Sequence, residues 1–149
     1  MDAGDFSQFD WMTFLGALTP RVTIEGPVEE PALRAAEARL GCRLSPALRS
    51  LLAQTGGFST DEFGPRDLWR LDEIVAVNEQ LRYPSALRSK DGSWADRLCF
   101  GDDVAGGYFY VGPTNTSVHV WNFIDREGHL LASDLATFYR GWLSGSLNT

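Results

Sequence analysis

Apolar side chains recur at three- and four-residue intervals in five segments of the chain, and this spacing places them on one face of a helix. The segments cover residues 10–20, 29–41, 45–57, 71–84 and 133–145. The residues expected to cap the helix starts are Asp10, Ser45, Asp72 and Ser133, and those expected to end helices are Pro20, Gly41, Gly56 and Pro84. A short link joins the second segment to the third, so these two predict a helical hairpin.

The apolar faces of these helices supply most of the predicted core. The residues expected to face inward are Trp11, Phe14, Leu15, Leu18, Leu33, Ala36, Leu40, Leu48, Leu51, Leu52, Ile74, Val77, Leu81, Leu135, Phe138, Tyr139 and Trp142. Trp69 lies beside an apolar pattern and is assigned to the core as well.

The period of the pattern changes after residue 96. The runs RLCFG, GGYFYVG and SVHVWNFI are short, rich in aromatic and β-branched residues, and bounded by turn formers, which is typical of sequential antiparallel strands. Turns are expected at 112–115 and 125–128, and a short fourth strand at 129–131. Residues 58–71 predict short strand pieces broken at Gly64 and Pro65, and residues 85–96 a polar loop. The fold class is therefore α+β: N-terminal helices and a helical hairpin packed on an antiparallel meander, closed by a C-terminal helix.

Length and charge narrow the picture further. A chain of 149 residues suits a single domain spanning 1–149. With 13 Lys and Arg against 20 Asp and Glu, the net charge of −7 argues against direct nucleic-acid binding and against an anionic membrane surface. It favours a cationic partner. Cys42 and Cys99 form no CxxC pair, the first ten residues contain no Lys or Arg, and no apolar run would span a bilayer, so a cytoplasmic protein is expected.

The chemical motifs of common enzymes are not found. The sequence has no Walker A, GxGxxG or GxSxG motif. His119 and His129 with Asp125 and Glu127 would make a weak metal cluster, but polar residues on an exposed strand face explain them better. An acid–base pair of Asp102 and Asp103 stays open as an alternative, although adjacent carboxylates on a strand point to opposite faces. We expect no catalytic residue, no cofactor and no metal.

Three blocks of the sequence together resemble the SUKH superfamily. The block ALRAAEARLGCRLSPALRSLLAQTGGF is similar to the family's helix pair through Glu37, Leu40-Gly41, Leu44-Ser45-Pro46 and Gly56-Gly57. The block LDEIVAVNEQL resembles a family helix that ends in an Asn-containing turn, here Asn78. The third block runs from LCFGDDVAGGYFYVGP to the final helix. The resemblance covers residues 29–143 and leaves the helix at 10–19 unmatched; Gly107 stands where many relatives carry Asp.

The resemblance implies a bacterial immunity protein that binds a cognate toxin and covers its active site. With the acidic charge, it implies a toxin with a basic surface, such as a nuclease. The alternative is an intracellular scaffold or regulatory module of the same fold with no toxin partner. The candidate partner-binding residues combine acidic and aromatic character and are Asp61, Glu62, Trp94, Asp102, Asp103, Tyr108, Tyr110, His119 and Trp121. For the acidic residues a solvated surface role stays open, and for Tyr108, Tyr110 and Trp121 a core role.

Overall fold

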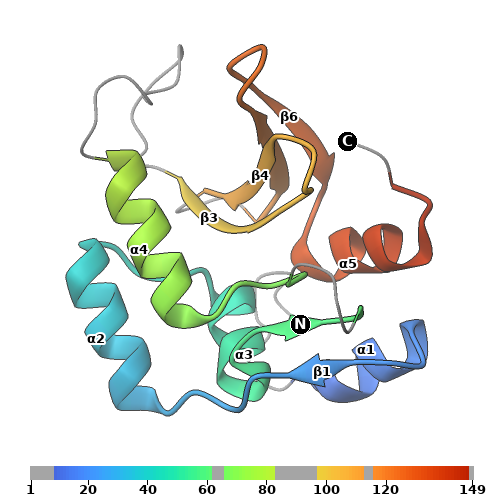
Figure 1. Cartoon of the computed structure of the whole chain (residues 1–149). Coiled ribbons are helices and arrows are strands. Elements are labelled where there is room, and N and C mark those ends of the chain that lie inside the picture. The colour runs from blue at the N-terminus through green and yellow to red at the C-terminus, as the bar shows by residue number, and fades with distance from the viewer. Residues whose placement is uncertain (1–8, 62–65, 83–96, 113–115, 148–149) are drawn as a thin grey trace.

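The computed structural model describes residues 9–61, 66–82, 97–112 and 116–147. In this part of the chain the helices are α1 (Trp11–Leu18), α2 (Glu30–Leu40), α3 (Pro46–Thr55), α4 (Leu71–Arg82) and α5 (Leu135–Ser144). The strands are β1 (Thr23–Ile24), β2 (Phe58–Ser59), β3 (Leu98–Asp102), β4 (Gly107–Val111), β5 (Val118–Asn122) and β6 (Glu127–Ala132). Figure 1 shows α2 and α4 side by side, with the meander above and α5 beneath its far end. The α+β fold class is confirmed.

Two of the expected helix caps are correct and two are wrong. The carboxylate of Asp10 accepts the Thr13 N–H, and the Ser45 hydroxyl accepts the Leu48 N–H. Asp72 lies inside the first turn of α4, whose first hydrogen bond runs from the Ile74 N–H to the Arg70 carbonyl.

Helix α5 is also capped by a different residue from the expected one. Asp134 takes the place predicted for Ser133, because its carboxylate is the group that accepts the Thr137 N–H.

The strands β3-β4-β5-β6 form the predicted antiparallel meander in that order. The last hairpin turn is shifted from its predicted position: it occupies residues 123–126, and Glu127 and Gly128 already belong to β6. The Asn122 side chain accepts the Ile124 N–H, and Arg126 takes a φ of 59°, so the chain reverses early. The strand pieces near 58–71 appear as β2 and a bridge from Phe58 to Leu68. The predicted break at Gly64 and Pro65, the turn at 113–115 and the loop at 85–96 lie outside the described residues.

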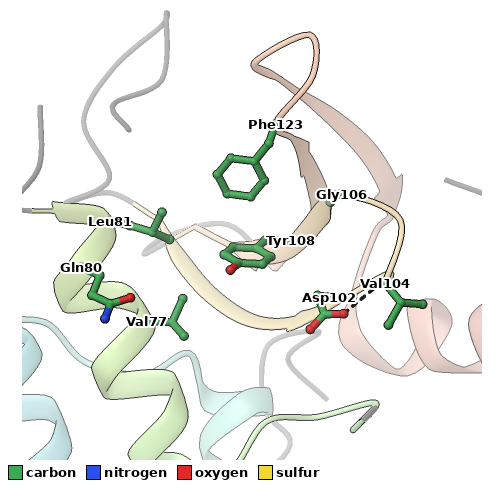
Figure 2. Close-up of a pocket in the computed structure, with 9 residues that line it drawn as sticks. Val77, Gln80, Leu81, Asp102, Val104, Gly106, Tyr108 and Phe123 are labelled. Atoms are coloured by element: carbon green, nitrogen blue, oxygen red, sulfur yellow. Dashed lines mark hydrogen bonds between the residues drawn. The ribbon is translucent and has the colours of Figure 1, made fainter. Parts of the chain in front are cut away.

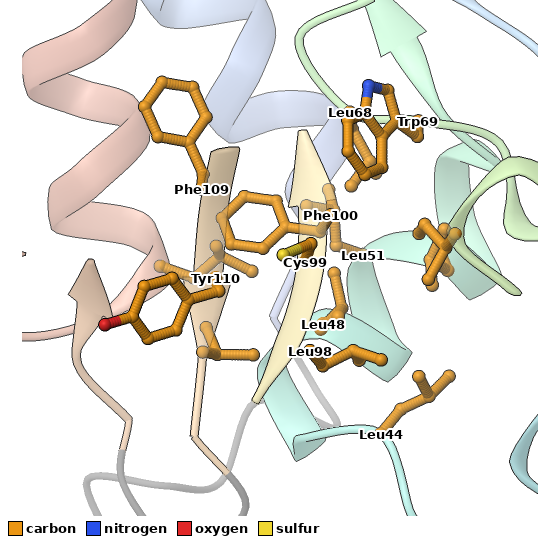
Figure 3. Packing of buried hydrophobic residues seen from close by; sticks show 14 of the residues in the cluster. Leu44, Leu48, Leu51, Leu68, Trp69, Leu98, Cys99, Phe100, Phe109 and Tyr110 are labelled. Carbon is orange, nitrogen blue, oxygen red and sulfur yellow. The ribbon is translucent and has the colours of Figure 1, made fainter. Parts of the chain in front are cut away.

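The two faces of the meander have different neighbours. On one face Phe100 and Phe109 pack against Phe138 of α5, with ring centroids 5.9 Å and 4.7 Å away. Figure 3 shows this core continuing to Leu48 and Leu51 of α3. The other face carries Tyr108 and Tyr110 of β4 with His119 and Trp121 of β5, and α4 packs along β3 beside it.

The helices hold one another through a few polar contacts. Glu37 of α2 accepts the Leu44 N–H and pairs with Arg49 of α3, which also pairs with Glu30. Arg49 thus ties the two predicted hairpin helices together.

The helix that the resemblance left unmatched is docked as well. Trp11 of α1 is fully buried, and its backbone N–H donates to the side chain of Gln54 in α3.

Candidate partner-binding site

A pocket of about 480 Å³ lies between α4 and the open face of the meander. It is lined by Val77, Gln80, Leu81, Asp102, Val104, Gly106, Gly107, Tyr108 and Phe123. Figure 2 shows the α4 side chains facing Tyr108 and Phe123 across it, with Asp102 and Val104 at one edge. The walls are therefore mostly apolar, and the polar groups sit at the margin.

The aromatic wall of the pocket is a chain of perpendicular rings. Tyr108 meets Phe123 with centroids 4.8 Å apart and an interplanar angle of 82°. On its other side Tyr108 meets Trp69 at 5.1 Å and 90°. Edge-to-face contacts of this kind are favourable and fix ring orientation. Burial raises the pKa of the Tyr108 phenol, so the wall is uncharged at neutral pH.

Asp102 and Asp103 organise the turn between β3 and β4. Asp102 accepts the indole N–H of Trp69 at 3.1 Å and the backbone N–H of Val104 at 2.9 Å. Asp103 is buried, and one of its oxygens accepts the N–H groups of Ala105 and Gly107, both at 2.8 Å. The two residues thus shape a turn, and only Asp102 lines the pocket.

Gly107 leaves room for this arrangement. A Cβ atom at this position would come within 2.6 Å of the Asp103 carboxylate and 2.8 Å of the Val120 side chain. This position therefore has to stay without a side chain while Asp103 occupies the space.

A second aromatic group continues along the same sheet face. Tyr110 and His119 are cross-strand partners and stack with centroids 5.2 Å apart. The Arg97 guanidinium lies 5.2 Å from the Tyr110 ring and 5.6 Å from the Trp121 ring, within the range of cation–π attraction. Burial, and then the Arg97 charge, lower the pKa of His119, which is therefore neutral at pH 7. Trp121 is 1% exposed and Tyr110 is 6% exposed, so both belong to the structure of the sheet.

The predicted site residues are thus only partly brought together. Asp102 and Tyr108 meet in the pocket, while Tyr110, His119 and Trp121 form the neighbouring group on the same face. Asp61 is exposed just after β2. Glu62 and Trp94 lie outside the described residues.

The pocket residues missed by the sequence analysis are Val77, Gln80, Leu81, Val104, Gly106, Gly107 and Phe123. The apolar period placed Val77 and Leu81 on the inward face of the helix, but it contained no sign that a pocket opens beside them. Phe123 lies within the predicted strand run SVHVWNFI, two residues after Trp121, so the alternation of that strand would have placed it on the same face. Val104 carried no signal at all.

One group of possible metal ligands lies at the end of the β5–β6 hairpin. Atoms of Asp125, Glu127 and His129 are all within 4.8 Å of one another, and all three residues are exposed. Asp125 accepts the Glu127 N–H with one carboxylate oxygen, and the other lies 3.1 Å from His129 Nε2. These contacts explain why the three side chains lie close together at the end of the hairpin.

Comparison with known proteins identifies a family whose model matches most of the chain. A model described as the SMI1 / KNR4 family (SUKH-1) matches residues 27–141, which include α2 to α4, the meander, the whole pocket and α5 up to residue 141. No curated protein matches the chain. Within the described residues, no helix is both long and apolar enough to cross a membrane.

Proposed function

This chain belongs to the SMI1/KNR4 (SUKH-1) family, a family of immunity proteins to polymorphic toxins, and from that membership we propose that it binds and neutralises one cognate toxin. The observation that carries the proposal is the match over residues 27–141, most of the chain. Members of the family are generally non-catalytic, so the protection rests on binding.

The proposed mechanism is occlusion of the toxin's active cleft. A specific interface buries roughly 1,600 Å² in total and concentrates its energy in a few aromatic and arginine contacts. The pocket, with Tyr108 and Phe123 in its wall and Asp102 at its edge, offers a concave anchor point for such an interface. In this mechanism the surface of the protein covers the cleft of the toxin, and none of its side chains takes part in a chemical reaction.

Charge supports a cationic target. The net charge of −7 raises the rate of encounter with a basic surface and repels other acidic proteins. A nuclease has such a surface because its cleft must hold phosphate. The proposed partner is therefore a toxin domain with a basic face, with a nuclease as the leading example.

Co-expression tests the proposal. A candidate toxin domain, chosen from the genes adjacent to this one, is induced in cells that also produce this protein, or an unrelated acidic protein of similar size and charge as control. We expect survival with this protein and death with the control. Equal survival with both proteins would contradict an immunity role, and would favour the scaffold or regulatory module as the function of the fold.

A further inference from the structure

We propose that the pocket between α4 and the meander receives an aromatic side chain of the partner, and that Asp102 pairs with an arginine or lysine adjoining that side chain. The identity of the partner as a toxin rests on the proposed function. The chemistry of recognition does not depend on that identity, because it follows from the residues of the pocket alone.

The walls of the pocket fit an aromatic ring. Val77 and Leu81 present aliphatic carbon on one side, and the rings of Tyr108 and Phe123 stand on the other (Figure 2). A volume of about 480 Å³ holds an indole or phenol with room for the adjoining backbone. Aromatic anchors seated in desolvated pockets are the residues that dominate protein interfaces.

The charge at the edge of the pocket is negative and uncompensated. Asp102 accepts hydrogen bonds from two neutral donors and forms an ion pair with no residue in the described part of the chain. The charged neighbours on α4 are engaged elsewhere: Glu79 pairs with Arg39, and Arg82 donates to the carbonyls of Leu40 and Arg97. A cation entering beside the pocket would therefore meet Asp102 without a competing ion pair from the residues that the structure describes.

At the edge of the pocket, Val104 combines a strained backbone with an exposed apolar side chain. Val104 has a φ of 57°, a left-handed conformation that is unfavourable for a β-branched residue. It is nevertheless 69% exposed, so the strain is not repaid by burial of its side chain. Strained residues of this kind collect at binding sites, where the surrounding structure holds them. Here the carboxylates of Asp102 and Asp103 hold the turn.

A second exposed apolar residue lies in the adjoining turn. Ile124 is 84% exposed and follows Phe123, whose N–H donates to the Gly106 carbonyl at 3.0 Å. That hydrogen bond joins the β3–β4 turn to the β5–β6 turn. Val104 in the pocket lining and Ile124 next to the lining residue Phe123 are therefore exposed apolar side chains on two turns that a hydrogen bond joins.

Titration with capped dipeptides tests the chemistry without the toxin. The probes are N-acetyl-Trp-Arg-amide, N-acetyl-Trp-Glu-amide and N-acetyl-Ala-Arg-amide. Binding of each probe is followed by two-dimensional NMR of the full chain. We expect Trp-Arg to shift the signals of Leu81, Tyr108 and Phe123 with a dissociation constant on the order of millimolar. Trp-Glu should bind about fivefold more weakly, because its charge is repelled by Asp102, and Ala-Arg should leave the pocket signals unchanged.

Three variants make the test specific. Val77→Phe fills the pocket from the half-buried face of α4 and should abolish the Trp-Arg shifts. Asp102→Asn should remove the preference for Trp-Arg over Trp-Glu. Glu29→Gln removes the same charge from an exposed site outside the pocket lining and should keep the preference. Thermal unfolding of each variant confirms that it is folded.

Two results would overturn the inference: Trp-Arg shifts that lie away from the pocket, and a charge preference that Glu29→Gln lowers as much as Asp102→Asn. Neither result touches the proposed immunity function, which the survival experiment decides. If this protein gives no protection in the survival experiment but Trp-Arg still binds in the pocket, the partner is not a toxin. The proposed recognition chemistry of the pocket would still hold.

Discussion

The side chain of Asn78 bonds to both backbone polar groups of Cys99. Its Oδ1 accepts the Cys99 N–H and its Nδ2 donates to the Cys99 carbonyl, both at 2.8 Å. Nδ2 also donates to the Ile74 carbonyl at 2.7 Å. Asn78 lies inside α4, not in the turn that the family resemblance implied, and from there it fixes the helix to β3. The position of the pocket wall depends on this contact.

Replacing Asn78 with Leu is expected to lower the free energy of unfolding by about 2–4 kcal/mol, because the Cys99 N–H and carbonyl would stay buried without a partner. Urea unfolding at pH 7 measures the loss. Glu79→Gln is the control, since its ion pair with the exposed Arg39 is worth about 0–1 kcal/mol. A loss no larger for Asn78→Leu than for Glu79→Gln would show that α4 is held by apolar packing instead.

Replacing Gly56 is expected to lower the free energy of unfolding far more than replacing Gly41, although both residues end helices with a positive φ. Gly41→Ala should cost about 1 kcal/mol of unfolding free energy for the left-handed backbone alone, because nothing lies near its Cβ position. Gly56→Ala should cost at least about 2 kcal/mol more, because its Cβ would collide with the Gly26 carbonyl. Paired denaturant curves measure the difference; equal losses would contradict the close approach.

Val104→Asn is expected to raise the free energy of unfolding by about 0.5–1 kcal/mol, because asparagine tolerates the left-handed conformation and the lost side chain is mostly exposed. Ile124→Asn, at an even more exposed residue without a positive φ, should change it by less than about 0.5 kcal/mol. Differential scanning calorimetry compares the two. If Val104→Asn is destabilising, the conformation of that residue stores no strain.

The Glu30–Arg49 pair predicts one part of the acid sensitivity. The Arg49 guanidinium, through its hydrogen bonds, lowers the pKa of Glu30 to about 2 from its ordinary 4.5. A carboxyl whose pKa is lower in the folded state stabilises the fold above pH 4.5 and loses this contribution as the pH falls towards 2.

Glu30→Gln should therefore be less stable than the unchanged protein at pH 6, and the difference should shrink steadily below pH 4.5. Urea midpoints at closely spaced pH values measure it. A stability difference that stays constant down to pH 2 would mean that the pair does not shift the Glu30 pKa.

The elements that the sequence predicts well are those with a strong local signal. The helices at residues 30–40 and 46–55 combine an apolar stripe with Pro near the start and Gly after the end, and both are found there. The meander follows from aromatic and β-branched runs between turn residues. The cap of α5 was wrong because Ser133 and Asp134 are neighbouring polar residues, and only the backbone geometry decides which one reaches the free N–H group. The cap of α4 was wrong because the helix starts before Asp72, with the Ile74 N–H bonded to the Arg70 carbonyl.

The site was harder to predict because it depends on contacts between distant segments. Tyr108 and Trp121 look alike in the sequence as strand aromatics, yet Trp121 is buried and Tyr108 lines the pocket. Asp102 and Asp103 are adjacent acids, yet one faces the pocket and the other is enclosed by the turn that it caps. Arg97 lies over Trp121 and the β3–β4 turn encloses Asp103, and neither contact is visible in the local pattern.

The most direct test of the account is a titration of the toxin's own activity. The purified toxin domain against which this protein protects cells is mixed with increasing amounts of this protein, and its activity is measured at low and at high salt. We expect toxin activity to fall to zero near one equivalent, and association to slow as salt screens the attraction to the acidic protein. Full toxin activity in the presence of excess protein, with no complex detectable at micromolar concentration, would contradict it.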